Sequence, residues 1–251
     1  MSCPQKNVLV DLTLSDSDSE QGSLDEEVLV ELEGILFTTR ERATLLDANA
    51  WLTDEIINAY TTRLLSRYPG DIHCCSTFFY TKLAKEMDAL WLKRWASRIQ
   101  YAQKRLLFIP INWSNSHWAL AVLVKEDGKG ILRYYDSMMS HSRGNRALEL
   151  LKKAFLLVQQ PDFVDKTKNG CKDDAVGALA FIMSKIRIAP SRNESVLMTE
   201  VPMGQPQQTD GSSCGVFCCW WIQRLLRKSS RDLFNVEIFR KEMLETIMAN
   251  S

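Results

Sequence analysis

Histidine is the scarcest of the residues that carry chemistry in this chain, with only His73, His117 and His141 among 251 residues. A cysteine nucleophile normally works with an imidazole base, so only three residues could serve as that base. An excess of charge is also lacking, because 31 Lys and Arg residues balance 31 Asp and Glu residues. The totals therefore give no reason to expect binding to nucleic acid or to an anionic membrane surface.

Long apolar runs and metal-ligand spacings are absent from the sequence as well. No run reaches the length of a membrane span, and the N-terminus lacks the basic and then apolar pattern of a secretory signal. The seven cysteines are odd in number and show no Cys-x-x-Cys spacing. We therefore expect reduced thiols, no metal, no cofactor, and a location in the nucleus, the cytoplasm or both.

One segment, residues 207–217, places a cysteine directly before a buried helix. Cys214 lies between Gly211 and Gly215, and residues 216–226 are apolar on nearly every side. The unpaired N–H groups and the positive dipole end of a helix N-terminus favour an anion, so a thiol there ionises more readily. On this segment alone Cys214 is either a nucleophile or a buried core cysteine.

Two apolar runs, residues 118–124 and 131–135, read as strands joined by a turn rich in Gly and charged residues. Antiparallel pairing across that turn sets residues whose numbers sum to about 255 opposite each other. His117 and Asp136 then meet within a rung of each other at one open end of a sheet. A purely structural His–Asp pair is the alternative, but the strand-end position favours a functional one.

Attack of a thiolate on a carbonyl needs a base, a group that holds the base, and donors for the oxyanion. Cys214, His117 and Asp136 could fill the first three roles as a Cys–His–Asp triad. Gln208 precedes the cysteine on the same loop, and its amide could join the backbone N–H of Cys214 as an oxyanion donor. Gln207 is its competitor, and spacing alone does not decide between them.

Other patterns predict the helices around this centre. A helix capped by Thr53 follows Trp51, which is either packed onto the core or presented to a ligand. Residues 77–80 are expected as a short strand or bend, and residues 82–99 as one amphipathic helix. The residues after Cys214 and those of 234–248 predict two further helices.

Six blocks of the chain occur in the order seen in the ubiquitin-like protease family, the SUMO-specific (sentrin) cysteine proteases and their relatives. The blocks are Trp51-Leu52-x-Asp54-Glu55-x-Ile57-Asn58, Thr77-Phe78-Phe79-Tyr80-x-Lys82-Leu83, Leu107-x-Ile109-Pro110-Ile111, His117-Trp118-x-Leu120, Tyr135-Asp136-Ser137 and Gln207-Gln208-x-x-Gly211-Ser212-x-Cys214-Gly215. The resemblance covers residues 28–251 and is far more specific than one catalytic motif.

The resemblance implies an α/β (α+β) papain-like fold, in which helices flank a central mixed or antiparallel sheet and the nucleophile begins a helix. It implies Cys214 as nucleophile, His117 as base, Asp136 as its orienting group and Gln208 as oxyanion donor. The implied reaction is cleavage after the C-terminal Gly-Gly of a ubiquitin-like modifier.

By the same resemblance, Trp51 and Trp118 are the two indoles that clamp the Gly-Gly tail. Flat rings that close over the chain admit glycine alone, because only glycine lacks a Cβ. The implied partner is SUMO with its conjugates, or another ubiquitin-like modifier, and we expect the protein to act on it as a monomer.

Residues 1–27 differ from the rest of the chain. A β-prone run that carries Val8, Val10, Leu12 and Leu14 precedes an acidic serine tract at 15–20. Such a segment is either a disordered tail or a linear motif that adds a strand to the sheet edge of a partner. The run resembles a SUMO-interacting motif, so we predict an acidic tail that binds SUMO.

The chain departs from the family pattern in two places. The family commonly has Asn-Gly-Ser-Asp-Cys, where this chain has Asp210-Gly211-Ser212-Ser213-Cys214, so the charge beside the nucleophile is altered. An insertion is predicted at 162–195, as a substrate-facing lobe or as a tolerated loop.

Three functions stay open at this level. The first is a SUMO protease, or a protease for another ubiquitin-like modifier or for ubiquitin. The second is an acyltransferase, since a thioester can pass to an amine instead of water, although no clustered Lys/Arg run offers a phosphate-binding pocket. The third is a non-catalytic SUMO-binding protein, which the four intact catalytic residue types argue against.

Overall fold

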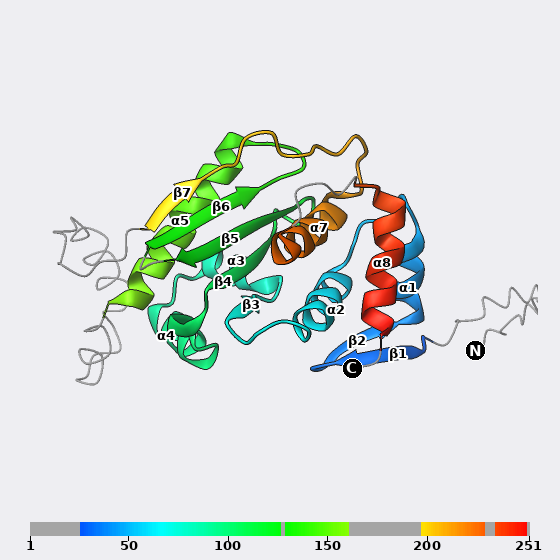
Figure 1. Cartoon of the computed structure of the whole chain (residues 1–251), viewed down its shortest axis with the longest axis horizontal. Helices are drawn as coiled ribbons and strands as arrows, with labels where there is room; N and C mark the ends of the chain where they lie inside the picture. The colour runs from blue at the N-terminus through cyan, green and yellow to red at the C-terminus, as the bar shows by residue number, and fades with distance from the viewer. Residues whose placement is uncertain (1–25, 127–128, 161–196, 229–233, 250–251) are drawn as a thin grey trace, which may run out of the picture.

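The protein is described from a computed structural model, which places residues 26–126, 129–160, 197–228 and 234–249 (Figure 1). The predicted SUMO-interacting run and the predicted insertion at 162–195 lie outside these residues. Within the described ranges no helix is both long and apolar enough to cross a membrane. The same ranges hold no group of three or more His, Cys, Asp or Glu side chains that could bind a metal ion.

A mixed sheet forms the centre of the molecule, with the strand order β3-β4-β5-β6-β7 (Figure 1). The strands are β3 (Ile72–Cys74), β4 (Leu106–Asn112), β5 (Trp118–Glu126), β6 (Lys129–Tyr135) and β7 (Leu197–Glu200). Strand β5 runs antiparallel to both of its neighbours, β4 and β6, whereas β3 runs parallel to β4 and β7 runs parallel to β6. The predicted fold class, a central mixed sheet flanked by helices, is confirmed.

Helices cover both faces of this sheet. They are α1 (Thr39–Leu46), α2 (Asp54–Leu65), α3 (Phe78–Lys85), α4 (Ala89–Arg98), α5 (His141–Gln159), α7 (Cys214–Arg227) and α8 (Val236–Met248). A short 3₁₀ turn (Tyr101–Gln103) follows α4, and a separate hairpin of β1 (Val28–Leu32) and β2 (Ile35–Thr38) precedes α1.

Alternation along the middle strands divides the core in two. Successive side chains of a strand point to opposite faces, so β4 and β5 supply both sides. Leu106, Phe108, Leu120 and Val122 belong to the core around α2, α7 and α8. Leu107, Ile109, Ala119 and Ala121 belong to the core around α3, α4 and α5. Buried on both faces, these strands read as nearly continuous apolar runs.

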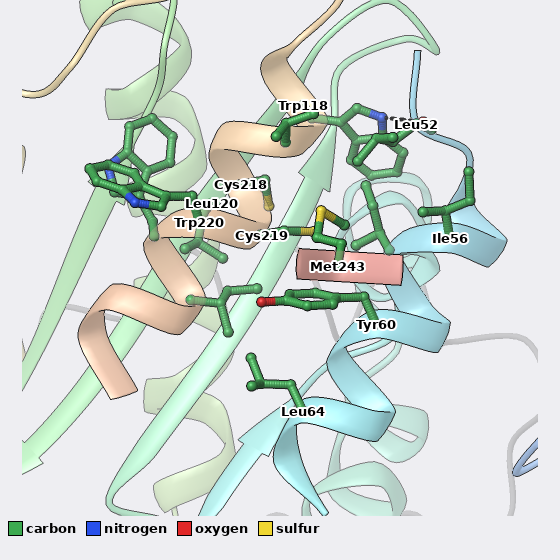
Figure 2. Packing of buried hydrophobic residues seen from close by; sticks show 14 of the residues in the cluster. Leu52, Ile56, Tyr60, Leu64, Trp118, Leu120, Cys218, Cys219, Trp220 and Met243 are labelled. Atoms are coloured by element: carbon green, nitrogen blue, oxygen red, sulfur yellow. Dashed lines mark hydrogen bonds between the residues drawn. The ribbon is translucent and has the colours of Figure 1, made fainter. Parts of the chain in front are cut away.

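Helix α7 is buried on every side along its first turns, from Cys214 to Gln223. It packs on β5 and on the helices α2 and α8 (Figures 1 and 2). Figure 2 shows Cys218 and Cys219 pointing into a core that also holds Tyr60 and Met243. The wholly apolar sequence after Cys214 thus reflects a helix in the interior of the fold.

The structure corrects one predicted region. Residues 77–80, expected as a strand or bend, open the helix α3, and the predicted single helix at 82–99 is interrupted between α3 and α4. The break has a local cause: the Asp88 carboxylate accepts hydrogen bonds from the N–H groups of Leu90 (2.8 Å) and Trp91 (3.1 Å) and so caps α4. The predicted cap of α2 is confirmed, since Thr53 Oγ1 accepts from the N–H of Ile56 at 3.3 Å.

Candidate active site

The β5–β6 hairpin brings a histidine and a carboxylate together. Leu120 pairs with Tyr135 in its register, which is the predicted sum of 255. His117 therefore precedes β5 where Asp136 follows β6, and His117 Nε2 lies 2.6 Å from Asp136 Oδ1. The two side chains are 7% and 0% exposed. A local register thus creates a buried imidazole–carboxylate pair at the strand ends.

The Asp136 carboxylate is surrounded by donors. Oδ1 accepts from the N–H of Met138 at 2.9 Å besides facing His117, and Oδ2 accepts from the Tyr134 hydroxyl at 3.1 Å and from Arg143 Nη2 at 3.1 Å. Burial alone would raise the pKa of Asp136, but the hydrogen bonds of His117 and Met138 and the charge of Arg143 hold it below the ordinary value. Asp136 is therefore an anion at neutral pH, although it is fully buried.

His117 lies between that anion and the Cys214 thiol. Burial lowers the pKa of the imidazole. The hydrogen bonds of the ring to Asp136 and Cys214, and the negative charges that these two side chains can carry, outweigh burial and raise the pKa to about 9. Because Nε2 faces Asp136, Nδ1 is the ring nitrogen left for the thiol. The structure thus unites the three groups that the sequence analysis proposed as a triad, and it favours a protonated imidazole beside the sulfur.

Cys214 begins α7 and is 1% exposed. The two other cysteines of this helix stay protonated at neutral pH, since burial raises the pKa of the Cys218 and Cys219 thiols well above the ordinary value. A Cβ placed on Gly215 would lie 2.9 Å from Leu52 Cβ and 3.1 Å from Trp118 Cδ1. The absence of a side chain on Gly215 therefore lets the start of α7 pack directly against Leu52, the neighbour of Trp51, and against Trp118.

The two indoles differ in exposure. Trp118 is 3% exposed, and its Nε1 donates to the carbonyl oxygen of Leu52 at 3.0 Å (Figure 2). Trp51, the preceding residue of that segment, is 43% exposed. Of the two readings of Trp51, the structure favours a ring presented outward over one packed onto the core. Trp118 anchors the strand end beside it.

The two competing glutamines occupy different positions. Gln207 Nε2 donates to the Asp136 carbonyl oxygen at 3.2 Å, and its Oε1 accepts from the N–H of Met139 at 2.9 Å, so this side chain holds the β6–α5 loop. Gln208 Oε1 accepts from the Ser137 hydroxyl at 2.6 Å, and its Nε2 donates to the Asp210 carbonyl oxygen at 2.7 Å. The amide of Gln208 is therefore bonded to the loop that leads to Cys214, so Gln208 is a better candidate than Gln207 for a donor near that thiol. Its oxyanion role stays a prediction.

Asp210, outside the predicted site, organises the loop before Cys214. Its Oδ1 accepts from the N–H groups of Ser212 (2.8 Å) and Ser213 (2.7 Å), and its Oδ2 accepts from the Ser213 hydroxyl at 2.7 Å. These hydrogen bonds outweigh the effect of burial and lower the pKa of Asp210. The chain therefore keeps a carboxylate in this loop, moved three positions from where the family commonly has one and bonded to the serine that replaces it.

Two further residues that sequence reasoning missed hold Asp136 in place. Gln205 Oε1 accepts from the N–H of Asp136 at 2.8 Å, and its Nε2 donates to the Tyr134 carbonyl oxygen at 2.9 Å, which continues the pairing of β6 beyond β7. Arg143 contacts the carboxylate from the first turn of α5. The cluster of glutamines within residues 205–208 could have pointed to Gln205, whereas no sequence pattern marks Arg143.

Comparison with known proteins places this site in a family. Residues 50–250 match the model of the Ulp1 protease family, C-terminal catalytic domain. Human sentrin-specific protease 2 is 30% identical over 205 residues, which cover 79% of this chain and 30% of that protein. A sentrin-specific protease of Caenorhabditis elegans is 27% identical over 237 residues, 91% of this chain and 29% of that protein. The chain thus spans about a third of the length of these relatives.

Solved structures show the same fold. The C-terminal Ulp1 protease domain in complex with SMT3, the yeast ortholog of SUMO, superposes with a TM-score of 0.63 at 21% identity, covering 90% of this chain and 89% of that one. The Xanthomonas campestris effector XopD bound to ubiquitin superposes with a TM-score of 0.51 at 19% identity, covering 79% and 92%. Together with the match over residues 50–250, the similarity establishes that the chain belongs to the Ulp1 protease family.

Proposed function

We propose that this protein is a cysteine protease and isopeptidase that cleaves after the C-terminal Gly-Gly of SUMO, either from a substrate lysine or from a precursor tail. The observation that carries the proposal is the position of His117 between Asp136 and the Cys214 thiol, at the N-terminus of α7, in a chain of the Ulp1 protease family. SUMO is chosen as the modifier because the curated relatives are sentrin-specific proteases and the Ulp1 domain was solved with SMT3.

The geometry supports the following reaction. Cys214 Sγ, as the thiolate, attacks the carbonyl carbon of the terminal glycine, and the imidazolium of His117 gives its proton to the departing amine as the C–N bond breaks. A thioester remains on the sulfur. His117, now neutral, takes a proton from water, whose oxygen attacks the thioester and releases the modifier. Asp136 holds the ring and stabilises its cationic form throughout.

Oxyanion stabilisation and substrate choice come from the surrounding segments. The backbone N–H of Cys214 at the start of α7 and the amide of Gln208 would donate to the developing oxyanion. Trp51 and Trp118 would close over the Gly-Gly tail, and Trp118 also holds the segment of Trp51 through its hydrogen bond to the Leu52 carbonyl oxygen. A ring that lies flat over the chain rejects any residue with a Cβ, which restricts cleavage to glycine.

Residues 1–27 would add a second SUMO contact. We interpret Val8, Val10, Leu12 and Leu14 as a strand that pairs with SUMO, and residues 28–251 as the catalytic domain with an insertion at 162–195. A second contact on a poly-SUMO chain raises the effective concentration of the next unit. Deletion of residues 1–27 should leave cleavage of a small fluorogenic conjugate intact and weaken cleavage of poly-SUMO. Loss of both activities would mean that residues 1–27 belong to the folded catalytic domain.

The location of the protein, in the nucleus, the cytoplasm or both, stays a prediction.

The decisive experiment offers the protein a panel of ubiquitin-like modifiers, each with a thiol-reactive group at its C-terminus. Labelling by SUMO alone, lost in Cys214→Ala, is the expected result. Labelling by ubiquitin or by another modifier would make that modifier the substrate in place of SUMO. Labelling by none would favour a SUMO-binding protein without catalysis. Cys219→Ala is the matched control, because it removes a buried thiol of the same helix and should leave labelling unchanged.

A further inference from the structure

The Asp136 carboxylate is shared between two cationic side chains from different elements. His117 faces Oδ1 at 2.6 Å, and Arg143 faces Oδ2 with Nη2 at 3.1 Å and Nε at 3.4 Å. The same Nη2 donates to the carbonyl oxygen of Met138 at 2.6 Å. The guanidinium therefore grips the carboxylate and, at the same time, the loop that follows it.

The position of Arg143 is itself fixed. It lies in the first turn of α5, where Ser140 caps the helix by accepting from the N–H of Arg143 at 3.4 Å. One third of its side chain is exposed, whereas the carboxylate that it contacts is fully buried. A guanidinium stays charged at every relevant pH and presents its donors in a rigid fork, so the contact persists across the working range.

Among the described residues, Arg143 is the one permanently charged cation that contacts the His117–Asp136 pair. His117 meets Asp136, which directly follows β6, and the Cys214 thiol at the start of α7. The Asp136 carboxylate meets the hydroxyl of Tyr134 on β6, which burial keeps neutral by raising its pKa, and the Asp136 backbone meets the neutral amides of Gln205 and Gln207. The charge that His117 experiences therefore depends on how far Arg143 offsets Asp136.

We propose that Arg143 is a positioning residue for the catalytic base: its guanidinium holds Asp136 through Oδ2 and offsets part of the negative charge that His117 meets through Oδ1. The inference rests on the proposed function, since it assigns the working pH range of that site to a residue of α5. Arg143 acts through Asp136, because its described contacts are with that carboxylate and the Met138 carbonyl oxygen.

Replacing Arg143 by Gln removes the charge and the fork. Asp136 then acts on His117 without compensation, so the imidazole should bind its proton more tightly and its pKa should rise by about 0.5 to 1 unit. The high-pH limb of kcat/KM should move upward by the same amount. A less well held carboxylate should lower kcat roughly threefold to tenfold while KM stays constant. Arg143→Lys keeps the charge but loses the fork, so it should restore the pKa and only part of kcat.

The test titrates His117 by NMR in the full chain carrying Cys214→Ala, with His117→Gln used to assign its signal among three histidines. Arg146→Gln is the matched control, because it removes the same charge one turn further along α5 at an exposed position. A rise in pKa for Arg143→Gln alone supports the proposal. An unchanged pKa, or an equal rise in Arg146→Gln, would overturn it.

Kinetics of the variants with Cys214 intact complete the experiment. An upward shift of the high-pH limb in Arg143→Gln, absent from Arg146→Gln, supports the proposal, and coincident profiles refute it. If Arg143→Gln does not fold, Arg143→Lys decides alone: lower kcat at constant KM supports the positioning role, and wild-type kcat contradicts it. If the wild type cleaves no modifier but the NMR shift is present, the proposed function fails and the contact between Arg143 and the His117–Asp136 pair stands.

Discussion

His73 lies on β3, and His117 directly precedes β5 of the same sheet, yet their environments shift their pKa values in opposite directions. Burial and the charges of Lys104 and Arg98 lower the pKa of His73 on β3 to about 4. At the end of β5, burial acts the same way on His117, but Asp136 and Cys214 outweigh it and raise the pKa to about 9. Burial alone therefore does not determine the protonation state of a histidine: its charged neighbours decide whether the ring holds a proton at neutral pH.

The largest expected effect comes from making the surroundings of His117 resemble those of His73. Asp136→Asn removes the anion, so the pKa of His117 should fall by roughly 2 units. Because about half of the imidazolium is then lost at pH 7 and the ring is poorly held, kcat should fall roughly 10²- to 10³-fold. Steady-state cleavage of a fluorogenic SUMO conjugate measures the loss. Glu200→Gln is the control, since it breaks the exposed ion pair with Arg133 (2.9 Å) and should leave kcat unchanged. Equal kcat in Asp136→Asn and wild type would refute the assigned role.

The two histidines should also give stability opposite dependences on pH. The pKa of His117 is raised on folding from 6.5 to about 9, so its contribution is complete below pH 6.5 and is lost as the pH rises to 9. The pKa of His73 is lowered to about 4, so the unfolded state binds more protons between pH 6.5 and 4, and stability is lost as the pH falls through that window.

Urea unfolding at a series of pH values separates these contributions. His73→Gln should remove about 1–2 kcal/mol of the loss in free energy of unfolding between pH 6.5 and 4. Asp136→Asn should flatten the loss between pH 6.5 and 9 and leave the acid side nearly unchanged. The same slope in His73→Gln and wild type on the acid side would show that this ring does not titrate as the structure indicates.

The smallest effect is expected from giving His73 a carboxylate neighbour. Arg98 is exposed at the end of α4, and its charge helps to lower the pKa of His73. Arg98→Glu replaces repulsion of the imidazolium by attraction, so the pKa should rise by roughly 0.5 to 1 unit, limited by solvent screening. NMR titration of His73 measures the shift, and Arg94→Glu on the same helix tests for a general effect of charge. No shift in Arg98→Glu would leave burial and the charge of Lys104 as the causes of the lowered pKa.

Parts of the fold were predictable because they are local. Strands β5 and β6 are neighbours along the chain and pair as a hairpin, and their register determines that His117 meets Asp136. The start of α7 at Cys214 followed from an apolar run after a glycine-flanked loop. Residues 77–80 were misassigned because a short apolar run fits a strand and a helix equally well, and only the packing of α3 on β4 decides between them.

The contacts that tune the site were not predictable in the same way. Arg143, Gln205 and Asp210 act through side chains on loops or a first helical turn, where no periodicity records their direction. The contrast between the two indoles is of the same kind: nothing in the sequence tells that Trp118 is buried under the Leu52 carbonyl oxygen while Trp51 stays exposed.

The order of residues along the chain was enough to predict that His117 pairs with Asp136 and that Cys214 lies at a helix start, because hairpin register and helix limits depend on neighbouring residues. Long-range packing was needed to bring these two features together. That requires α7 to pack on β5 with Gly215 against Leu52 and Trp118, a contact between segments far apart in sequence whose geometry depends on the packed core.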